Sequence, residues 1–372
     1  MSRSCFPDAP RAVSPDPAAD RQWTRRALAI LEQEAMRSAD THLLRLDLPA
    51  FPGVTMYLKD EAAHPTGSLK HRLARSLFLY ALCNGRLREG QVVVDASSGS
   101  TAISEAWFAR QLGLPFVAVM PACTSPRKIA DVQALGGACD LVDEPSQVHA
   151  RAAWHASRGA CHLDQFNLAE RATDWRGNNN IAESILHQMT REPYPEPAWI
   201  VCGAGTGGTS ATIGRYLRYR GLSTQLCVAE PAGGAFAHGW RLRDPEARAS
   251  QPSLIEGIGR PRVEPGFVFD VVDHVIEVED EQSIAAAWLL EELLGRRYGG
   301  SSGTNFIACL RLAETLRDRG LGGSIVTLLC DRGSRYEQTL FDAGWLRARG
   351  IDPEPGQRAL ARYVATPGLR MV

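Results

Sequence analysis

The sequence has no excess of charge, no long apolar run and no paired cysteines. Its 41 lysines and arginines balance 42 acidic residues, and the resulting net charge of -1 gives no overall field to attract nucleic acid or an anionic membrane. Charged residues interrupt every apolar stretch before the roughly 18 residues that a membrane span needs, and the first twenty residues lack the apolar core of a signal peptide. We therefore expect a cytoplasmic protein that binds a small molecule, with no nucleic acid or membrane partner.

The nine cysteines follow neither a metal-binding nor a disulfide pattern. Their number is odd and the chain contains no Cys-x-x-Cys pair. Most lie inside apolar stretches such as 199–202, where a reduced thiol packs as a small apolar group. We expect no disulfide framework and no metal site.

Short β-branched runs alternate with helical patterns from residue 92 onward. Apolar residues spaced by three or four predict the helices, and the short runs predict the strands. This alternation is typical of an α/β chain with mainly parallel strands. The expected strands are 92–94, 116–119, 199–201, 226–228, 275–278 and 325–329, and the expected helices are 100–112, 127–135, 181–189, 209–220, 283–294 and 304–318.

A turn rich in glycine and threonine, Gly203–Thr209, follows one expected strand and opens a helix. Backbone N–H groups at such a helix start converge on an anion. The hydroxyl groups of Thr206 and Thr209 add donors that suit a phosphate monoester. A tight turn that binds no ligand is the alternative.

The same turn also satisfies a dinucleotide-binding motif. Gly203, Gly205 and Gly208 match Gly-x-Gly-x-x-Gly, and Glu230 follows at the distance expected for an acid on a nicotinamide ribose. A dinucleotide would leave two further motifs without a role. These are a lysine after a Pro/Gly turn, in Pro65–Arg72, and a serine-rich turn, described next.

Lys70 lies at the start of an expected helix. An amine near the positive end of a helix dipole resists protonation and can form an imine with an aldehyde. Pyridoxal phosphate needs such a lysine, a phosphate site and a partner for its ring nitrogen. Lys70 and the Gly203–Thr209 turn therefore predict pyridoxal 5'-phosphate as the cofactor, whereas a lysine alone is usually a solvated surface residue.

The serine-rich turn Ser97–Thr101 lies between an expected strand and the next helix. Its hydroxyl and N–H groups can hold the α-carboxylate of an amino-acid substrate at the helix N-terminus. The alternative is an ordinary serine N-cap without a ligand.

Together these motifs resemble the cysteine synthase and cystathionine β-synthase family of fold-type II pyridoxal-phosphate enzymes. Seven segments match in order from about residue 66 to 336. They are Ser68–Arg72 (cofactor lysine), Ser97–Ala102 (substrate carboxylate), Gln165-Phe166, Gly205–Thr209 (phosphate), Glu256–Gly259 (pocket loop), Gly299–Gly303 (pyridine nitrogen) and Asp331–Tyr336.

The resemblance implies two open, twisted, mainly parallel sheets flanked by helices, and a homodimer. Its implied organisation is a flexible tail over 1–22, an N-terminal α/β domain over 23–170 with a mobile part at about 100–160, a C-terminal α/β domain over 171–350, and a tail over 351–372. The implied catalytic residue is Lys70. The implied cofactor residues are Lys70, Ser100, Gly205, Thr206, Gly207, Gly208, Thr209 and Ser301, and the implied substrate residues are Ser97, Ser98, Ser100, Thr101, Gln165 and Gly257.

Departures from the family pattern narrow the expected reaction. Ser100 replaces the asparagine of ordinary cysteine synthases, Ala102 replaces a glycine and His71 replaces an aspartate. The serine-rich turn with Ser100 and Ala102 resembles that of the L-cysteine desulfhydrase branch of the family. This resemblance implies elimination of hydrogen sulfide from L-cysteine to give pyruvate and ammonia, with Lys70 as general base. Two alternatives stay open: β-replacement, as in cysteine synthase or cystathionine β-synthase, and a non-catalytic cysteine or sulfide sensor that retains the cofactor.

Overall fold

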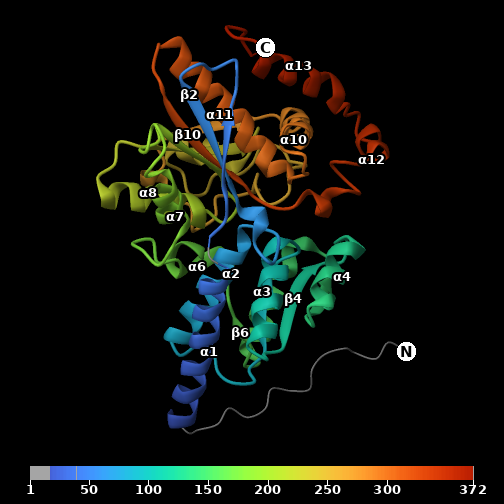
Figure 1. The fold of residues 1–372 in the computed structure, drawn as a ribbon. Coiled ribbons are helices and arrows are strands. Elements are labelled where there is room, and N and C mark those ends of the chain that lie inside the picture. Colours follow the sequence, from blue (N-terminus) through green and yellow to red (C-terminus); the bar gives the residue numbers. More distant parts are fainter. Residues whose placement is uncertain (1–16, 39, 372) are drawn as a thin grey trace. The chain divides into compact units, whose positions relative to one another are not determined.

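The computed structural model describes residues 17–38 and 40–371, which fold into two compact units (Figure 1). Unit 1 comprises the described residues up to 38 together with residues 64–173, and unit 2 comprises residues 40–63 and 174–371. Each unit contains its own sheet. The chain is therefore an α/β protein with two sheets, as the sequence predicts.

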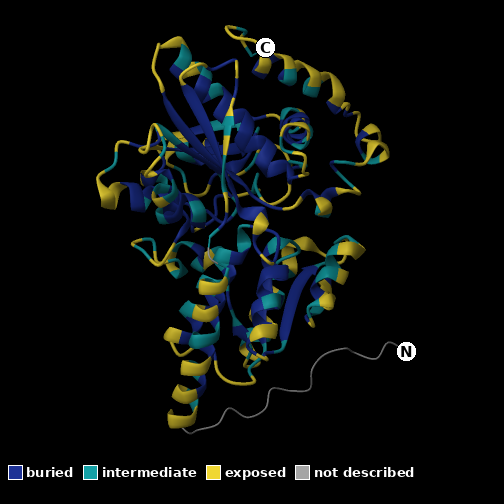
Figure 2. Cartoon of the chain, in the orientation of Figure 1, coloured by how far each residue is buried: buried dark blue, intermediate teal, exposed yellow. Residues whose placement is uncertain are grey.

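Unit 1 is built on a four-stranded parallel sheet with the order β5-β4-β3-β6. The central strand β4 is almost entirely buried, as its dark colour in Figure 2 shows. Its strands and helices are α1 (Pro17–Arg37), α2 (Lys70–Cys83), β3 (Val93–Ala96), α3 (Ser100–Gln111), β4 (Phe116–Pro121), α4 (Pro126–Ala134), β5 (Ala138–Val142), α5 (Val148–Ser157), β6 (Cys161–His162) and α6 (Gln165–Ala172).

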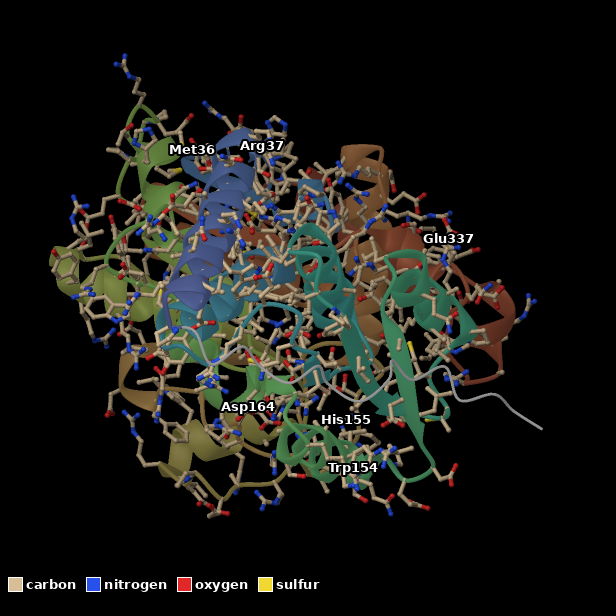
Figure 3. The ribbon with its side chains drawn as sticks, turned by 90° about the horizontal axis from the view of Figure 1, so that it is seen from below. Met36, Arg37, Trp154, His155, Asp164 and Glu337 are labelled. Atoms are coloured by element: carbon tan, nitrogen blue, oxygen red, sulfur yellow. The ribbon has the colours of Figure 1, made fainter. Side chains whose placement is uncertain are left out.

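Helix α1 illustrates how the sequence pattern places a helix on the core of unit 1. Trp23, Ala27 and Leu31 recur every four residues, so they share one face, and all three are buried. Met36, near the C-terminal end of the same helix, is 82% exposed and lies at the surface in Figure 3. Helix α1 thus packs one apolar face and leaves its end in solvent.

Unit 2 is built on a six-stranded sheet with the order β1-β2-β10-β7-β8-β9, in which only the β1–β2 pair is antiparallel. Its strands and helices are β1 (Leu43–Asp47), β2 (Val54–Asp60), α7 (Ile181–Met189), β7 (Trp199–Gly203), α8 (Gly208–Arg220), β8 (Gln225–Pro231), α9 (Ala235–Leu242), β9 (His274–Val278), α10 (Asp280–Leu294), α11 (Gly300–Asp318), β10 (Gly323–Leu329), α12 (Ala343–Arg347) and α13 (Pro353–Ala365).

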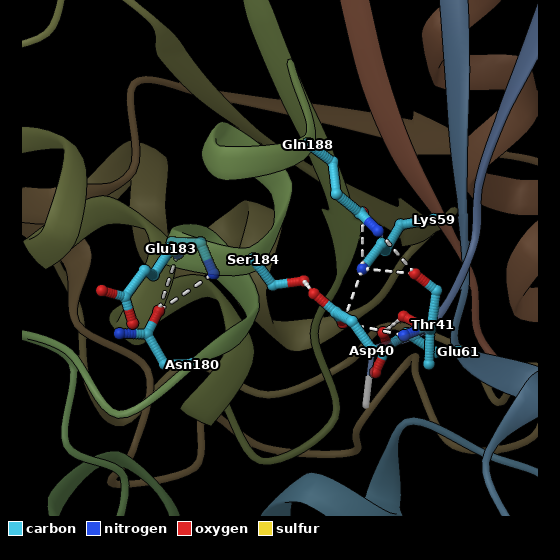
Figure 4. A network of polar contacts seen from close by, with 9 residues as sticks. Asp40, Thr41, Lys59, Glu61, Asn180, Glu183, Ser184 and Gln188 are labelled. Carbon is cyan, nitrogen blue, oxygen red and sulfur yellow. Dashed lines mark hydrogen bonds and ion pairs between the residues drawn. The ribbon is translucent and has the colours of Figure 1, made fainter. Parts of the chain in front are cut away.

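A buried lysine holds the β1–β2 hairpin segment to helix α7 in unit 2 (Figure 4). The ammonium group of Lys59 donates hydrogen bonds to Asp40 Oδ1 (2.9 Å), Thr41 O (2.8 Å) and Gln188 Oε1 (2.7 Å). Asp40 in turn accepts hydrogen bonds from Ser184. The charge of Lys59 is therefore compensated although its side chain is fully buried.

All six expected strands and all six expected helices are present, with shifts of a few residues at their ends. The two tails differ from the prediction. Of the expected flexible tail over 1–22, residues 1–16 lie outside the described residues, and 17–22 belong to α1. The expected C-terminal tail contains α13, because Leu360, Tyr363 and Val364 form a buried apolar stripe.

Candidate active site

Lys70 is the first residue of α2 and follows a turn in which Gly67 has a φ of 71°. That left-handed conformation favours glycine. The backbone N–H of Lys70 donates to Ser68 Oγ at 3.3 Å, and Ser68 is fully buried. The turn chemistry therefore places the lysine at the helix N-terminus, as the sequence predicts.

The serine-rich turn connects β3 to α3, and its hydroxyl groups divide into two kinds. Ser97 Oγ accepts hydrogen bonds from the N–H of Ala102, in the first turn of α3, at 3.2 Å and from the N–H of Gly99, the N-cap residue, at 3.4 Å. Within the described chain, the hydroxyl groups of Ser98 and Thr101 make no hydrogen bond. The N-cap residue is Gly99, which makes no side-chain bond, so the serine N-cap alternative is wrong. Ser97 instead stabilises the turn, while Ser98 and Thr101 keep their hydroxyl groups for a ligand.

Gln165 lies beside the serine-rich turn, at the start of α6. Its side-chain Nε2 donates to Ala96 O at 3.0 Å, one residue before Ser97. Its backbone N–H donates to Asp95 Oδ2 at 3.2 Å. Unit 1 therefore brings together two segments that are far apart in the sequence and that resemble the carboxylate site.

Asp95 and Glu105 are buried carboxyl groups that the sequence reasoning did not single out. Besides Gln165, Asp95 accepts hydrogen bonds from the backbone of Ala96 (2.8 Å) and from His162 Nε2 (3.2 Å). Glu105, on α3, is fully buried, and neither of its carboxyl oxygens has a hydrogen-bonding partner. Burial, and to a smaller extent the charge of Asp95, raises the pKa of Glu105 well above its ordinary value.

His71, which follows Lys70, lies in a second polar cluster of unit 1. Its Nε2 donates to Glu34 Oε1 at 3.0 Å, and its Nδ1 lies 3.2 Å from Thr66 Oγ1. Thr66 Oγ1 lies 3.0 Å from Ser104 Oγ, which donates to Ser100 O. This cluster connects α1, the turn before α2, and α3, so His71 holds the helix of the lysine against the helix that follows the serine-rich turn.

The Gly203–Thr209 turn of unit 2 has the features that a phosphate group requires. Gly207 has a φ of 83°, and a Cβ atom there would lie 2.5 Å from the backbone of Gly266, so no larger residue fits. The turn leads directly into α8, whose first N–H groups point along the helix axis. Thr209 Oγ1 makes no hydrogen bond to the described residues.

Ser301 and Gly257 are the other site residues expected in unit 2. Ser301 lies in the first turn of α11 and is buried, and its hydroxyl group makes no hydrogen bond within the described chain. A buried hydroxyl group of this kind suits a neutral acceptor such as a pyridine nitrogen. Gly257 is exposed and has a φ of 88°, with open space at the position of a Cβ atom.

Glu230 has a structural role that the dinucleotide alternative does not explain. Its carboxylate accepts hydrogen bonds from the backbone N–H groups of Phe236 (2.9 Å) and Ala237 at the start of α9. A Cβ atom at residue 234 would lie 2.3 Å from this carboxylate. Burial raises the pKa of Glu230 to about 7, although these hydrogen bonds oppose the shift.

Among residues 17–38 and 40–371, no helix is both long and apolar enough to cross a lipid bilayer. The same residues contain no group of three histidine, cysteine, aspartate or glutamate side chains arranged to hold a metal ion.

Comparisons with known proteins agree with the motifs. A family model described as "Pyridoxal-phosphate dependent enzyme" matches residues 36–331. The L-cysteine desulfhydrase Cds1 of Mycobacterium tuberculosis is 55% identical over 348 residues, which are 92% of this chain and 95% of that protein.

More distant relatives and solved structures also align with most of this chain, at lower identity. Cysteine synthase 1 of Neurospora crassa is 31% identical over 355 residues, and the alignment covers 88% of each chain. The crystal structure of O-ureido-L-serine synthase matches with a TM-score of 0.74 and 26% identity, over 84% of this chain and 95% of that one. The similarity thus extends over most of the described chain and includes both units.

Proposed function

This chain belongs to the family of pyridoxal-phosphate dependent enzymes, and on that premise we propose that it is an L-cysteine desulfhydrase, which converts L-cysteine to hydrogen sulfide, pyruvate and ammonia. The family membership confirms the fold class and the cofactor that the sequence predicts. The observation that carries the reaction is the 55% identity to an L-cysteine desulfhydrase over 92% of this chain.

The sequence supplies the three kinds of group that the cofactor needs, namely an amine, an anion-binding turn and a hydroxyl group for the ring nitrogen. When bound, pyridoxal phosphate supplies an electron sink for a negative charge that develops on the α-carbon of an amino acid. In our proposal Lys70 holds the cofactor and then removes the α-proton at its Nζ atom. The turn Gly205–Thr209 binds the phosphate with its backbone N–H groups and two threonine hydroxyls, and Ser301 faces the ring nitrogen.

The substrate is held by the serine-rich turn. Ser98, Thr101 and the N-terminus of α3 bind the α-carboxylate in this proposal, and Gln165 supports the turn through its hydrogen bond to Ala96 O. Ser97 contributes by accepting hydrogen bonds from the backbone of the turn and of the first turn of α3. Ser100, where related synthases have an asparagine, is assigned to both the cofactor and the substrate, and Gly257 is assigned to the pocket loop.

β-Replacement is the second candidate, because Neurospora crassa cysteine synthase 1 also aligns with most of this chain. Elimination and replacement share the steps up to loss of the β-substituent, and they differ in whether a second thiol is added. The lower identity of 31% and the serine at position 100 favour elimination. A sensor that retains the cofactor would bind L-cysteine without forming sulfide or pyruvate. The homodimer and the cytoplasmic location stay predictions from the sequence.

The role of Lys70 is tested with two matched variants of the purified, cofactor-loaded protein. Lys70→Ala is expected to lose the absorbance band of the imine and all sulfide formation. Lys128→Ala, which changes a lysine on α4, is expected to keep both. Full turnover in the Lys70→Ala variant would show that this lysine has no role in the reaction, whichever substrate is used.

A further inference from the structure

Glu105 is the most unusual ionisable residue of unit 1. It lies on α3, in the second turn after the serine-rich turn, and its side chain is completely buried. Neither Oε1 nor Oε2 has a hydrogen-bonding partner among the described residues. An ionised carboxylate in such a place costs several kcal/mol, roughly, unless donors surround it. Glu105 is therefore neutral and carries a proton.

The groups packed around Glu105 explain where its proton can move. Helix α3 packs against α2, α4, β3 and β4. Asp95 on β3 and Lys70 on α2 act on Glu105 electrostatically, in opposite directions. His71 on α2 is bonded to Glu34. The strand β4 has no charged residue, and the charged residues of α4 are Arg127, Lys128 and Asp131, of which Arg127 pairs with Asp131.

Asp95 is buried but differs from Glu105 because it is surrounded by donors. It accepts hydrogen bonds from two backbone N–H groups and from His162 Nε2 at 3.2 Å. These donors stabilise its negative charge. In this pair Glu105, which has no donors around it, carries the proton, and Asp95, which has three, carries the negative charge.

His162 connects this carboxyl pair to solvent. Its side chain is 17% exposed, whereas that of Asp95 is 1% exposed. Burial alone would lower the pKa of His162, but the hydrogen bond to Asp95 and its charge raise it above the ordinary value. An imidazole that is bonded to a carboxylate and partly exposed can pass protons between that carboxylate and water.

We propose that Glu105, Asp95 and His162 form a proton relay that exchanges protons between solvent and the Lys70 amine. The proposal rests on the proposed role of Lys70. In each turnover Lys70 Nζ gains a proton from the substrate α-carbon and must lose one before it can bond to the cofactor again. Glu105 takes up this proton at one oxygen as its own proton moves to the Asp95 carboxylate, and Asp95 regains its charge when the proton leaves through His162 to water. Glu105 and His162 are positioning residues, because they act through Lys70.

Three variants of the cofactor-loaded enzyme test the relay. Glu105→Gln keeps the shape but has no carboxyl proton to transfer, Glu105→Asp keeps a carboxyl group, and His162→Ala removes the link to water. The matched control is Glu230→Gln, which changes a buried carboxyl group of unit 2 that caps α9.

We expect Glu105→Gln to keep the cofactor absorbance band and a KM for L-cysteine within about twofold of the wild type, but to lower kcat by roughly tenfold. That loss is smaller than the hundredfold or more, roughly, that a directly acting acid or base contributes. Glu105→Asp should recover part of kcat. In His162→Ala, added imidazole should raise kcat in proportion to its concentration, a response that a purely structural role does not produce.

Three results would overturn the relay. They are a kcat of Glu105→Gln equal to that of the wild type, a loss of kcat in Glu230→Gln as large as that in Glu105→Gln, and no effect of imidazole on the kcat of His162→Ala. The imidazole measurement decides the question even if Glu105→Gln fails to fold. If the wild type instead binds the cofactor and releases no sulfide from L-cysteine, the proposed function fails, and this result is distinct from unchanged turnover in the variants.

Discussion

Lys59 and Glu105 are both completely buried ionisable residues, but their surroundings differ. In unit 2, Lys59 donates three hydrogen bonds, one of them to the carboxylate of Asp40. In unit 1, Glu105 has no hydrogen-bonding partner at either oxygen. A satisfied buried charge fixes neighbouring segments in place. A buried polar group without hydrogen-bonding partners costs stability even when it is neutral, and such a cost is typical of a functional site.

The largest expected effect comes from breaking the satisfied cluster. Lys59→Met should lower the free energy of unfolding by about 3 kcal/mol, because Asp40 and the carbonyl of Thr41 lose a charged donor. Urea unfolding of the whole chain measures this loss. Arg45→Met is the matched control: its ion pair with Asp47 is about half exposed, so its loss should leave the free energy of unfolding nearly unchanged. Equal losses in the two variants would contradict the comparison.

A buried carboxyl group of unit 2 should give stability a dependence on pH. The pKa of Glu230 is raised from 4.5 to about 7, so the folded chain binds its proton more tightly than the unfolded chain does. The resulting stabilisation is present below pH 4.5 and disappears as the pH rises through about 7. Glu230→Gln should remove a slope of up to about 1 kcal/mol per pH unit in this window, as measured by unfolding at a series of pH values. An unchanged slope in the variant would show that Glu230 is not the source of the pH dependence of stability.

Replacing Glu105 by an apolar residue should separate stability from turnover. Glu105→Leu removes a buried polar group without partners, so the free energy of unfolding should rise by about 1 kcal/mol. The same variant should form sulfide more slowly than the wild type. Chemical unfolding and a sulfide assay on one preparation test both expectations. A large loss of stability would show that Glu105 has a structural role like that of Lys59.

The smallest effect distinguishes two neighbouring serines. Ser97→Ala should lower the free energy of unfolding by about 0.5–1 kcal/mol, because Ser97 Oγ accepts hydrogen bonds from the backbone N–H groups of Gly99 and Ala102. Ser98→Ala should leave stability nearly unchanged and raise the KM for L-cysteine, because the Ser98 hydroxyl makes no hydrogen bond within the described chain. Thermal unfolding and steady-state kinetics measure the two effects, and the reverse pattern would exchange the roles assigned to these serines.

The sequence predicted the regular elements where apolar periodicity was strong, and it missed those defined by distant partners. The helix over 181–189 was predicted with its exact bounds, whereas the β1–β2 hairpin was not predicted. Strand β2 pairs in parallel with β10, more than 250 residues later, and a local pattern does not contain such a partner. For the same reason residues 40–63, which the sequence grouped with 23–170, lie in unit 2.

For the candidate site, the sequence identified the turns but not the buried acids. Lys70 and the Gly203–Thr209 turn are recognisable because proline, glycine and hydroxyl residues in a fixed order have few structural explanations. Glu105 resembles any acidic residue on a helix until the structure shows that both oxygens are buried. The bond between Asp95 and His162 joins residues 67 positions apart, which no local motif reveals.

The most direct test of the central claim is the yield of sulfide, pyruvate and thioether from L-cysteine, with and without a second thiol. We expect equal amounts of sulfide and pyruvate, little thioether even when the second thiol is in excess, and none of these products from Lys70→Ala. Thioether as the main product, with little pyruvate, would contradict the assignment as a desulfhydrase and identify the chain as a β-replacement enzyme.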